Sequence, residues 1–153
     1  MTQLSEIYNA RILELAANMP KPDRLADAHG TATAHSKLCG STVSVDLKLA
    51  GPSVCAYGQT VKACLLGQAA AAVMGHNILG STAEELRDVA KQMRKMLKEG
   101  GPPPQGRWAD LAVLEPVKDY KARHASTLLV FDAVEAALAK AEAREEPVAH
   151  AGA

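Results

Sequence analysis

Aromatic side chains are scarce in this sequence. They make up 3% of its 153 residues, with one tryptophan and one phenylalanine. The core must therefore consist of aliphatic side chains and alanine, with methionine filling gaps. Apolar residues in total reach 48%, which is typical of a globular chain and excludes a wholly disordered one. At this length we expect a single domain.

An excess of charge is also absent. Seventeen Lys and Arg residues balance seventeen Asp and Glu residues, so the formal net charge is zero. This balance indicates neither nucleic acid nor a membrane surface as a partner. No apolar run approaches the roughly 20 residues of a membrane-spanning helix. The first residues, MTQLSEIYNARILEL, also lack the basic start and apolar stretch of a secretory signal.

Cysteine is rare as well. Cys39, Cys55 and Cys64 are odd in number and far apart in sequence, so no disulfide framework is expected. A reducing, cytoplasmic location fits this pattern better. Cys55 falls within a predicted strand and outside any motif, and we expect it to pack in the core.

The hydrophobic pattern predicts an α+β fold, with a small antiparallel β-sheet packed against several α-helices. Alternating apolar residues predict a half-buried strand over 42–50, and a Gly-Pro turn returns the chain as a strand over 54–61. The segment TATAHSKL before them also has strand character. Helical periodicity predicts helices at 4–18, 65–77, 82–98 and 124–144. The sequence predicts a single domain over 1–145, followed by a flexible C-terminal tail over 146–153.

Small residues dominate the helix predicted at 65–77. Gly67 near its start lowers the stability of the helix but allows another backbone to approach closely. For the next helix, either Ser81 or Thr82 is the N-cap, and Glu84 or Glu85 is placed for a capping box.

Cys39 and Cys64 are the candidate functional residues. Cys39 lies just before the strand 42–50, and Cys64 follows the strand 54–61 and opens a helix, so both can meet at one end of the sheet. The N-terminus of a helix favours the thiolate, which binds metal or accepts sulfur. His124, at the start of the last helix, is a third donor suited to zinc or iron. Plain packing of a buried free cysteine is the alternative reading of each thiol.

Several segments resemble the U-type iron–sulfur scaffolds, the NifU/IscU-like family, and within it the SufU-like branch. The resemblance covers about residues 4 to 140. LCGSTVSVDLKL resembles the family's Cys-Gly-Asp followed by a strand, and ACLLGQAAAAVMGHNILGST resembles its Gly-Cys segment with a run of small residues. IYNARILELAANMPKPDR resembles the opening helix, and VKDYKARHASTLLVFDAVEAAL resembles the stretch with the third cysteine and the closing helix.

The resemblance implies a role in iron–sulfur cluster assembly. Such a scaffold holds a nascent, transient [2Fe–2S] cluster or a Zn²⁺ ion. It receives sulfur from a cysteine desulfurase and passes sulfur or cluster to recipient apoproteins or cluster carriers. This is the work of a scaffold more than of an enzyme. The alternatives are a zinc-dependent sulfurtransferase and a non-catalytic adaptor that has lost cluster binding.

The match to the family's ligand set is incomplete. Cys39 and Cys64 match the first two of three cysteines and are the candidate persulfide acceptors. Ser41 stands where the family has an aspartate. The third cysteine is absent, and its place falls on one of the residues 124–126. Of these three residues, His124 is the good metal ligand, so Cys39, Cys64 and His124 form the predicted metal and cluster site.

Overall fold

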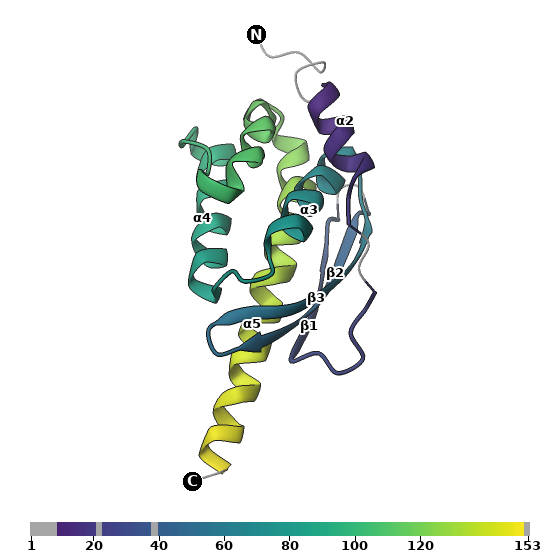
Figure 1. Ribbon diagram of the computed structural model, residues 1–153. Helices are drawn as coiled ribbons and strands as arrows, with labels where there is room; N and C mark the ends of the chain where they lie inside the picture. The colour runs from purple at the N-terminus through teal and green to yellow at the C-terminus, as the bar shows by residue number, and fades with distance from the viewer. Residues whose placement is uncertain (1–8, 21–22, 38–39, 152–153) are drawn as a thin grey trace.

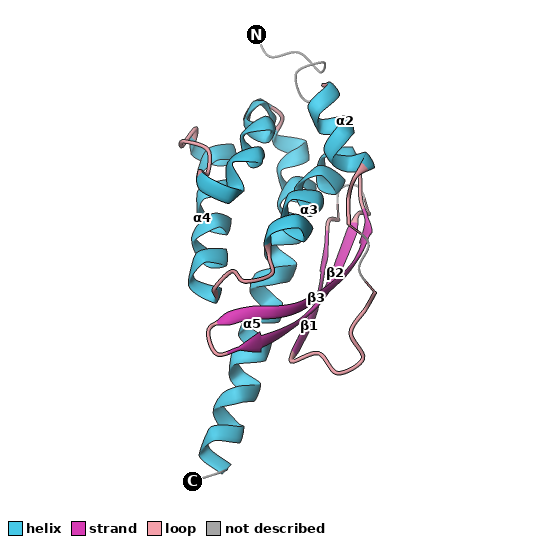
Figure 2. Cartoon of the chain, viewed as in Figure 1, coloured by secondary structure: helices cyan, strands magenta, loops and turns pink. Residues whose placement is uncertain are grey.

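The protein is described here by a computed structural model that covers residues 9–20, 23–37 and 40–151, with side chains up to residue 143. Its elements follow one another as helix, three strands, then helices (Figures 1 and 2). They are α2 (Ala10–Ala17), β1 (Gly30–His35), β2 (Thr42–Ala50), β3 (Ser53–Lys62), α3 (Leu65–Asn77), α4 (Ala83–Glu99), the 3-10 segments η1 (Gly106–Asp119) and η2 (Lys121–Arg123), and α5 (His124–Ala151).

The three strands form one antiparallel sheet in the order β1-β2-β3. Along β2, the apolar side chains of the alternating pattern are buried against the helices, as the sequence predicts: Val43, Val45, Leu47 and Leu49. The long helix α5 runs across the sheet, behind α3 and beside α4 (Figure 1). The predicted α+β fold is therefore confirmed.

The bounds of β2, β3, α3 and α4 agree with the predicted ranges to within about two residues. Of the helix predicted at 4–18, the described part is helical over Ala10–Ala17, and residues 4–8 lie outside the described residues. The last helix continues to Ala151, beyond the predicted 144. The flexibility of 146–153 and the single-domain division at 145 stay predictions. No helix in the described part of the chain is long and apolar enough to cross a membrane.

The expectation that Cys55 packs in the core is wrong. Lys48 pairs with Ala56 and Leu49 pairs with Val54, so Cys55 is the extra residue of a β-bulge in β3. The core-facing position beside it belongs to Val54, which is buried, and the Cys55 side chain is exposed.

The segment after α4 is a regular 3-10 helix, η1. Four apolar residues are buried at a spacing of three: Trp108, Leu111, Leu114 and Val117. A 3-10 helix has three residues per turn, so this spacing keeps one apolar face toward the core. Trp108 Nε1 donates a hydrogen bond of 2.7 Å to the Glu85 carboxylate, which joins η1 to α4. Thr82 is the N-cap of α4, because its hydroxyl accepts from Glu85 N at 3.0 Å.

Helices α3 and α5 approach very closely at Gly67. A Cβ atom at this position would lie 2.8 Å from Ala63 Cβ and 3.0 Å from the carbonyl oxygen of Ser126. The run Ala69–Ala72 that follows is fully buried. The predicted role of Gly67, to let another backbone approach, is confirmed, and the backbone it admits is the first turn of α5.

A buried carboxylate ties the segment before β1 to the sheet. Asp46 on β2 is 2% exposed and accepts hydrogen bonds from the Arg24 guanidinium, from Leu25 N at 2.9 Å and from Thr31 Oγ1 at 2.7 Å. These bonds, above all those from Arg24, lower the pKa of Asp46 from 3.8 to about 2. The fold therefore favours the charged form of this side chain.

The Asp46 network predicts a loss of stability in acid. A depressed pKa contributes stability that is complete above the unfolded value near 4 and is lost as the pH falls through about 2. Asp46→Asn should lower the free energy of unfolding at pH 7 by about 2 kcal/mol and flatten its decline between pH 4 and pH 2. Urea unfolding across this pH range measures both effects.

Asp27→Asn is the matched control, because its carboxylate pairs with Lys48 at 2.6 Å but is 78% exposed. It should leave the unfolding free energy nearly unchanged. An equal effect of the two substitutions would contradict the assignment to the buried network.

Gly67→Ala should destabilise the protein. The added methyl group would press on the Ser126 backbone, and overpacking costs about 1–3 kcal/mol, more than the roughly 1 kcal/mol that alanine gains in a helix. Gly75→Ala in the same helix is the control, because its new methyl group would meet only the Pro20 ring at 3.0–3.3 Å. Thermal unfolding should show a clearly lower midpoint for Gly67→Ala, and equal midpoints would contradict the close approach.

Candidate functional site

One end of the sheet gathers the segments that carry the candidate cysteines. Thr42, the first residue of β2, pairs with His35 at the end of β1 and with Lys62 at the end of β3. The β1–β2 connection and the start of α3 therefore lie at the same end, as the sequence predicts.

The described residues of the β1–β2 connection are joined by backbone hydrogen bonds. Ser36 N donates to Ser41 O and Gly40 N donates to Ser36 O, both at 2.9 Å. Ser41, at the family's aspartate position, is buried here. Cys39 lies outside the described residues, so its predicted role stays a prediction.

Cys64 is the N-cap residue of α3, with an extended backbone conformation (φ −66°, ψ 172°). The predicted position at the start of a helix is confirmed. Its side chain is half-buried and makes no capping hydrogen bond, so the thiol does not cap the helix. Instead, Cys64 Sγ lies 3.4 Å from Ser126 Oγ in the first turn of α5.

Ser126 is therefore the residue of α5 that faces Cys64. It is 3% exposed, and its hydroxyl also lies within hydrogen-bond distance of Arg123 O, at 3.3 Å. The contact depends on Gly67, since a side chain there would displace the Ser126 backbone. Of the three residues in the place of the third cysteine, this is the one beside the Cys64 thiol.

His124 is buried at the start of α5, and its imidazole faces η1. Nε2 lies 3.0 Å from Val117 O and 3.1 Å from Lys118 O, so this nitrogen carries the proton and donates. Nδ1 is then the ring nitrogen that a metal could take. The role of His124 as a ligand stays a prediction.

Within the described ranges, no three His, Cys, Asp or Glu side chains lie close enough together to hold a metal ion. The described side of the site thus offers one thiol, from Cys64, and one neutral hydroxyl, from Ser126. A thiolate is a good ligand for zinc and iron, whereas a serine hydroxyl stays protonated at neutral pH.

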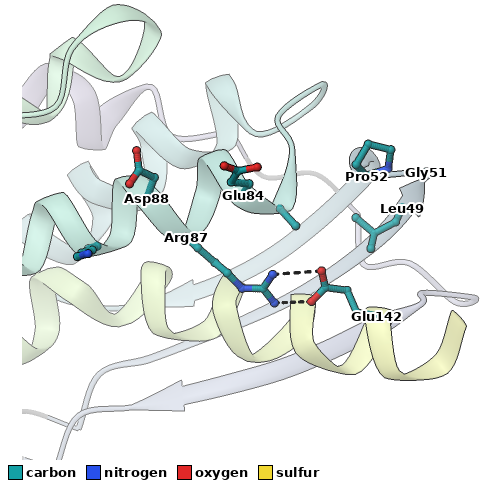
Figure 3. Close-up of a pocket in the computed structure, with 9 residues that line it drawn as sticks. Leu49, Gly51, Pro52, Glu84, Arg87, Asp88 and Glu142 are labelled. Atoms are coloured by element: carbon teal, nitrogen blue, oxygen red, sulfur yellow. Dashed lines mark hydrogen bonds and ion pairs between the residues drawn. The ribbon is translucent and has the colours of Figure 1, made fainter. Parts of the chain in front are cut away.

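A separate hollow of about 540 Å³ lies at the other end of the sheet, near the turn between β2 and β3 (Figure 3). Because β2 has nine residues, its two ends are roughly 25 Å apart. Arg87 of α4 lies across the hollow and pairs with both carboxylate oxygens of Glu142 on α5. This pair links the two helices, and the hollow plays no part in the Cys64 site.

Known proteins resemble the chain along nearly its whole length. The crystal structure of the N-terminal part of a nitrogen-fixing NifU-like protein from Brucella abortus is 54% identical and has a TM-score of 0.89, covering 91% of this chain and 96% of that one. The iron–sulfur cluster assembly scaffold protein IscU of Thermotoga maritima is 25% identical over 134 residues, which are 88% of this chain and 94% of the relative.

A third relative supports the fold alone. A proposed iron–sulfur cluster assembly scaffold protein for the SUF system from Fervidobacterium islandicum has a TM-score of 0.78 at 22% identity, over 89% of this chain and 99% of the other. No protein-family model matches the chain. The identity to the Brucella protein over almost all of both chains, together with the shared fold, is decisive: the chain belongs to the NifU/IscU-like family of U-type iron–sulfur scaffolds.

Proposed function

We propose that this protein is a scaffold for iron–sulfur cluster assembly. The observation that carries the proposal is the near full-length similarity to the NifU-like protein and to IscU, the second of which is an iron–sulfur cluster assembly scaffold protein. We propose the half-buried thiol of Cys64, at the start of α3, as the site of this activity.

Cys64 is the proposed sulfur acceptor on the described side of the site, and Cys39 is the proposed second thiol. A cysteine desulfurase would present a persulfide, and the Cys64 thiolate would attack its outer sulfur. One sulfur–sulfur bond forms, one breaks, and the donor cysteine leaves as a thiolate, so the step needs no external oxidant. The Cys64 side chain makes no capping hydrogen bond, and its half-buried sulfur contacts Ser126 Oγ.

The cargo is a nascent cluster, for which we propose the [2Fe–2S] type. Cys39 and Cys64 would supply thiolates, and the His124 imidazole is the proposed third ligand. The same set could hold Zn²⁺ with a water molecule, which is the arrangement of the alternative zinc-dependent sulfurtransferase. Recipient apoproteins or cluster carriers would take up the product.

Substitution of single cysteines tests this assignment. Cys39→Ser and Cys64→Ser should each reduce bound iron and sulfide per chain by at least tenfold, because serine keeps the size but not the soft anionic ligand. Cys55→Ser is the matched control, since Cys55 is exposed on the bulge of β3, and it should retain wild-type content. Iron, sulfide and zinc are measured after anaerobic reconstitution, with folding checked by circular dichroism.

The outcomes separate the candidate functions. Iron with sulfide supports the scaffold, and zinc alone supports the sulfurtransferase. A folded wild-type chain that takes up neither would favour the adaptor. Equal metal content in the wild type and in the Cys39 and Cys64 variants would place the site elsewhere.

Two replacements of His124 test its proposed role through Nδ1. His124→Gln retains a side-chain nitrogen near the position of Nε2, so it can still donate to Val117 O while the imidazole ligand is lost. If His124 is a ligand, Gln should lower metal content severalfold with the unfolding midpoint little changed. His124→Asn, which places its amide nearer Nδ1, serves as the comparison. Wild-type metal content in both variants would remove His124 from the ligand set.

A further inference from the structure

We propose that the outer face of α4 is an interface on which two copies of this chain pair in antiparallel orientation. The outer face is defined by four exposed, charged residues: Glu84, Asp88, Lys91 and Lys95. A second copy is the occupant because the charges of this face are complementary to themselves. The inference does not depend on the proposed function.

The four side chains lie on the side of α4 that faces away from the core. They follow one another at spacings of four, three and four residues, which keeps them within about 60° of one another around a helix. The buried residues of α4, among them Leu86, Val89 and Met93, lie on the opposite side. In Figure 1, α4 lies at the left margin of the molecule, and no described element covers its outer side. The face is therefore open to a partner.

The other charged residues in the body of α4 already have partners within the molecule. Glu85 forms an ion pair with η1, and Arg87 and Arg94 form ion pairs with α5. Within the described residues, the four side chains of the outer face form no salt bridge. Figure 3 shows the contrast, since Arg87 points to Glu142 whereas Glu84 and Asp88 point away from α5.

The order of charges on the outer face is unfavourable in an isolated helix. Glu84 and Asp88 are four residues apart, as are Lys91 and Lys95, and like charges at this spacing repel each other. The helix dipole favours Glu84 in the first turn, but its effect fades before the middle of a 17-residue helix. A partner helix that carries basic residues first and acidic residues second would relieve both repulsions.

An antiparallel second copy presents this reversed order. When Glu84 lies opposite Lys95 of the second copy, Asp88 lies opposite Lys91 of that copy, because the two spacings are equal. The two-fold axis then passes between Asp88 and Lys91, and each kind of ion pair forms twice. No like charges meet at the axis.

The hollow of about 540 Å³ beside the outer face adds an apolar contact to this pairing. Glu84, Asp88 and Lys91 line it together with Leu49 and Pro52. The stem of a lysine can pack on apolar side chains while its charged end reaches a carboxylate. In the proposed pairing, this lysine is the one from the second copy that lies opposite Glu84.

A single helix face is small beside the roughly 1,200 Å² of a standard interface, so the dimer should be weak and sensitive to salt. Sedimentation velocity of the full-length protein tests this. At about 20 mM salt the fraction of dimer should rise as the protein concentration approaches the millimolar range, and it should fall at about 500 mM salt, where the charges are screened.

Reversal of single charges identifies the surface. Lys95→Glu should raise the dissociation constant about tenfold, because it turns two attractions of the dimer into two repulsions. Adding Glu84→Lys to Lys95→Glu restores both ion pairs with their signs exchanged and should return the dissociation constant to near the wild-type value.

Lys62→Glu is the matched control. It changes the net charge by the same amount as Lys95→Glu, but Lys62 is exposed at the end of β3, away from α4. It should leave the dissociation constant unchanged. Circular dichroism verifies that each variant folds.

Three results would overturn the inference. One is a wild-type protein that stays monomeric at low salt, which would exclude a second copy as the occupant of the outer face. Another is an equal effect of Lys95→Glu and Lys62→Glu, and the third is a double variant that remains as weak as Lys95→Glu. Each would leave the proposed scaffold function intact, because iron and sulfide retention is measured separately.

Discussion

The architecture depends on how closely α5 lies against its neighbours. Two glycines make this possible: a Cβ at Gly67 of α3 would lie 3.0 Å from the Ser126 carbonyl oxygen, and one at Gly30 of β1 would lie 2.0 Å from the Ala137 carbonyl oxygen. The helix thus contacts α3 near its start and the sheet farther along, through backbone with no side chain between. Its position is fixed at two points, and both the core and the Cys64 site are built around that position.

The same packing determines which side chain of α5 meets Cys64 at the end of the sheet. Because the first turn of α5 is held against Gly67, residue 126 and not its neighbours meets the Cys64 thiol. The imidazole of His124 turns instead to the η1 backbone, where it joins two segments of the core. The first turn of α5 therefore contributes to the core and also contacts the Cys64 side chain. Farther along α5, the pairs of Arg94 with Glu135 and of Arg87 with Glu142 hold α4 against it.

Much of this fold could be predicted from local patterns. Each local pattern predicts one element: the alternation of apolar residues predicts β2, the Gly-Pro pair predicts the turn, and helical periodicity predicts α4. The cap at Thr82 marks where α4 begins. The 3-10 helix η1 could also have been predicted from the spacing of its apolar residues: Trp108, Leu111, Leu114 and Val117. They recur every three residues, whereas an α-helix shows a mixture of three and four. The exposure of Cys55 could not be predicted from local sequence, because a β-bulge depends on how two strands pair.

The sequence by itself determined the α+β class, the residues that can act as ligands, and the position of Cys64 at a helix start, because each of these follows from residue type and short-range spacing. Which residue of 124–126 faces that thiol was decided only by the tertiary structure. Successive residues of a helix point about 100° apart, so the answer depends on how α5 is rotated against α3. That rotation is set by contacts at Gly67 and Gly30 with residues about 60 and 100 positions away in the chain, which no local pattern encodes.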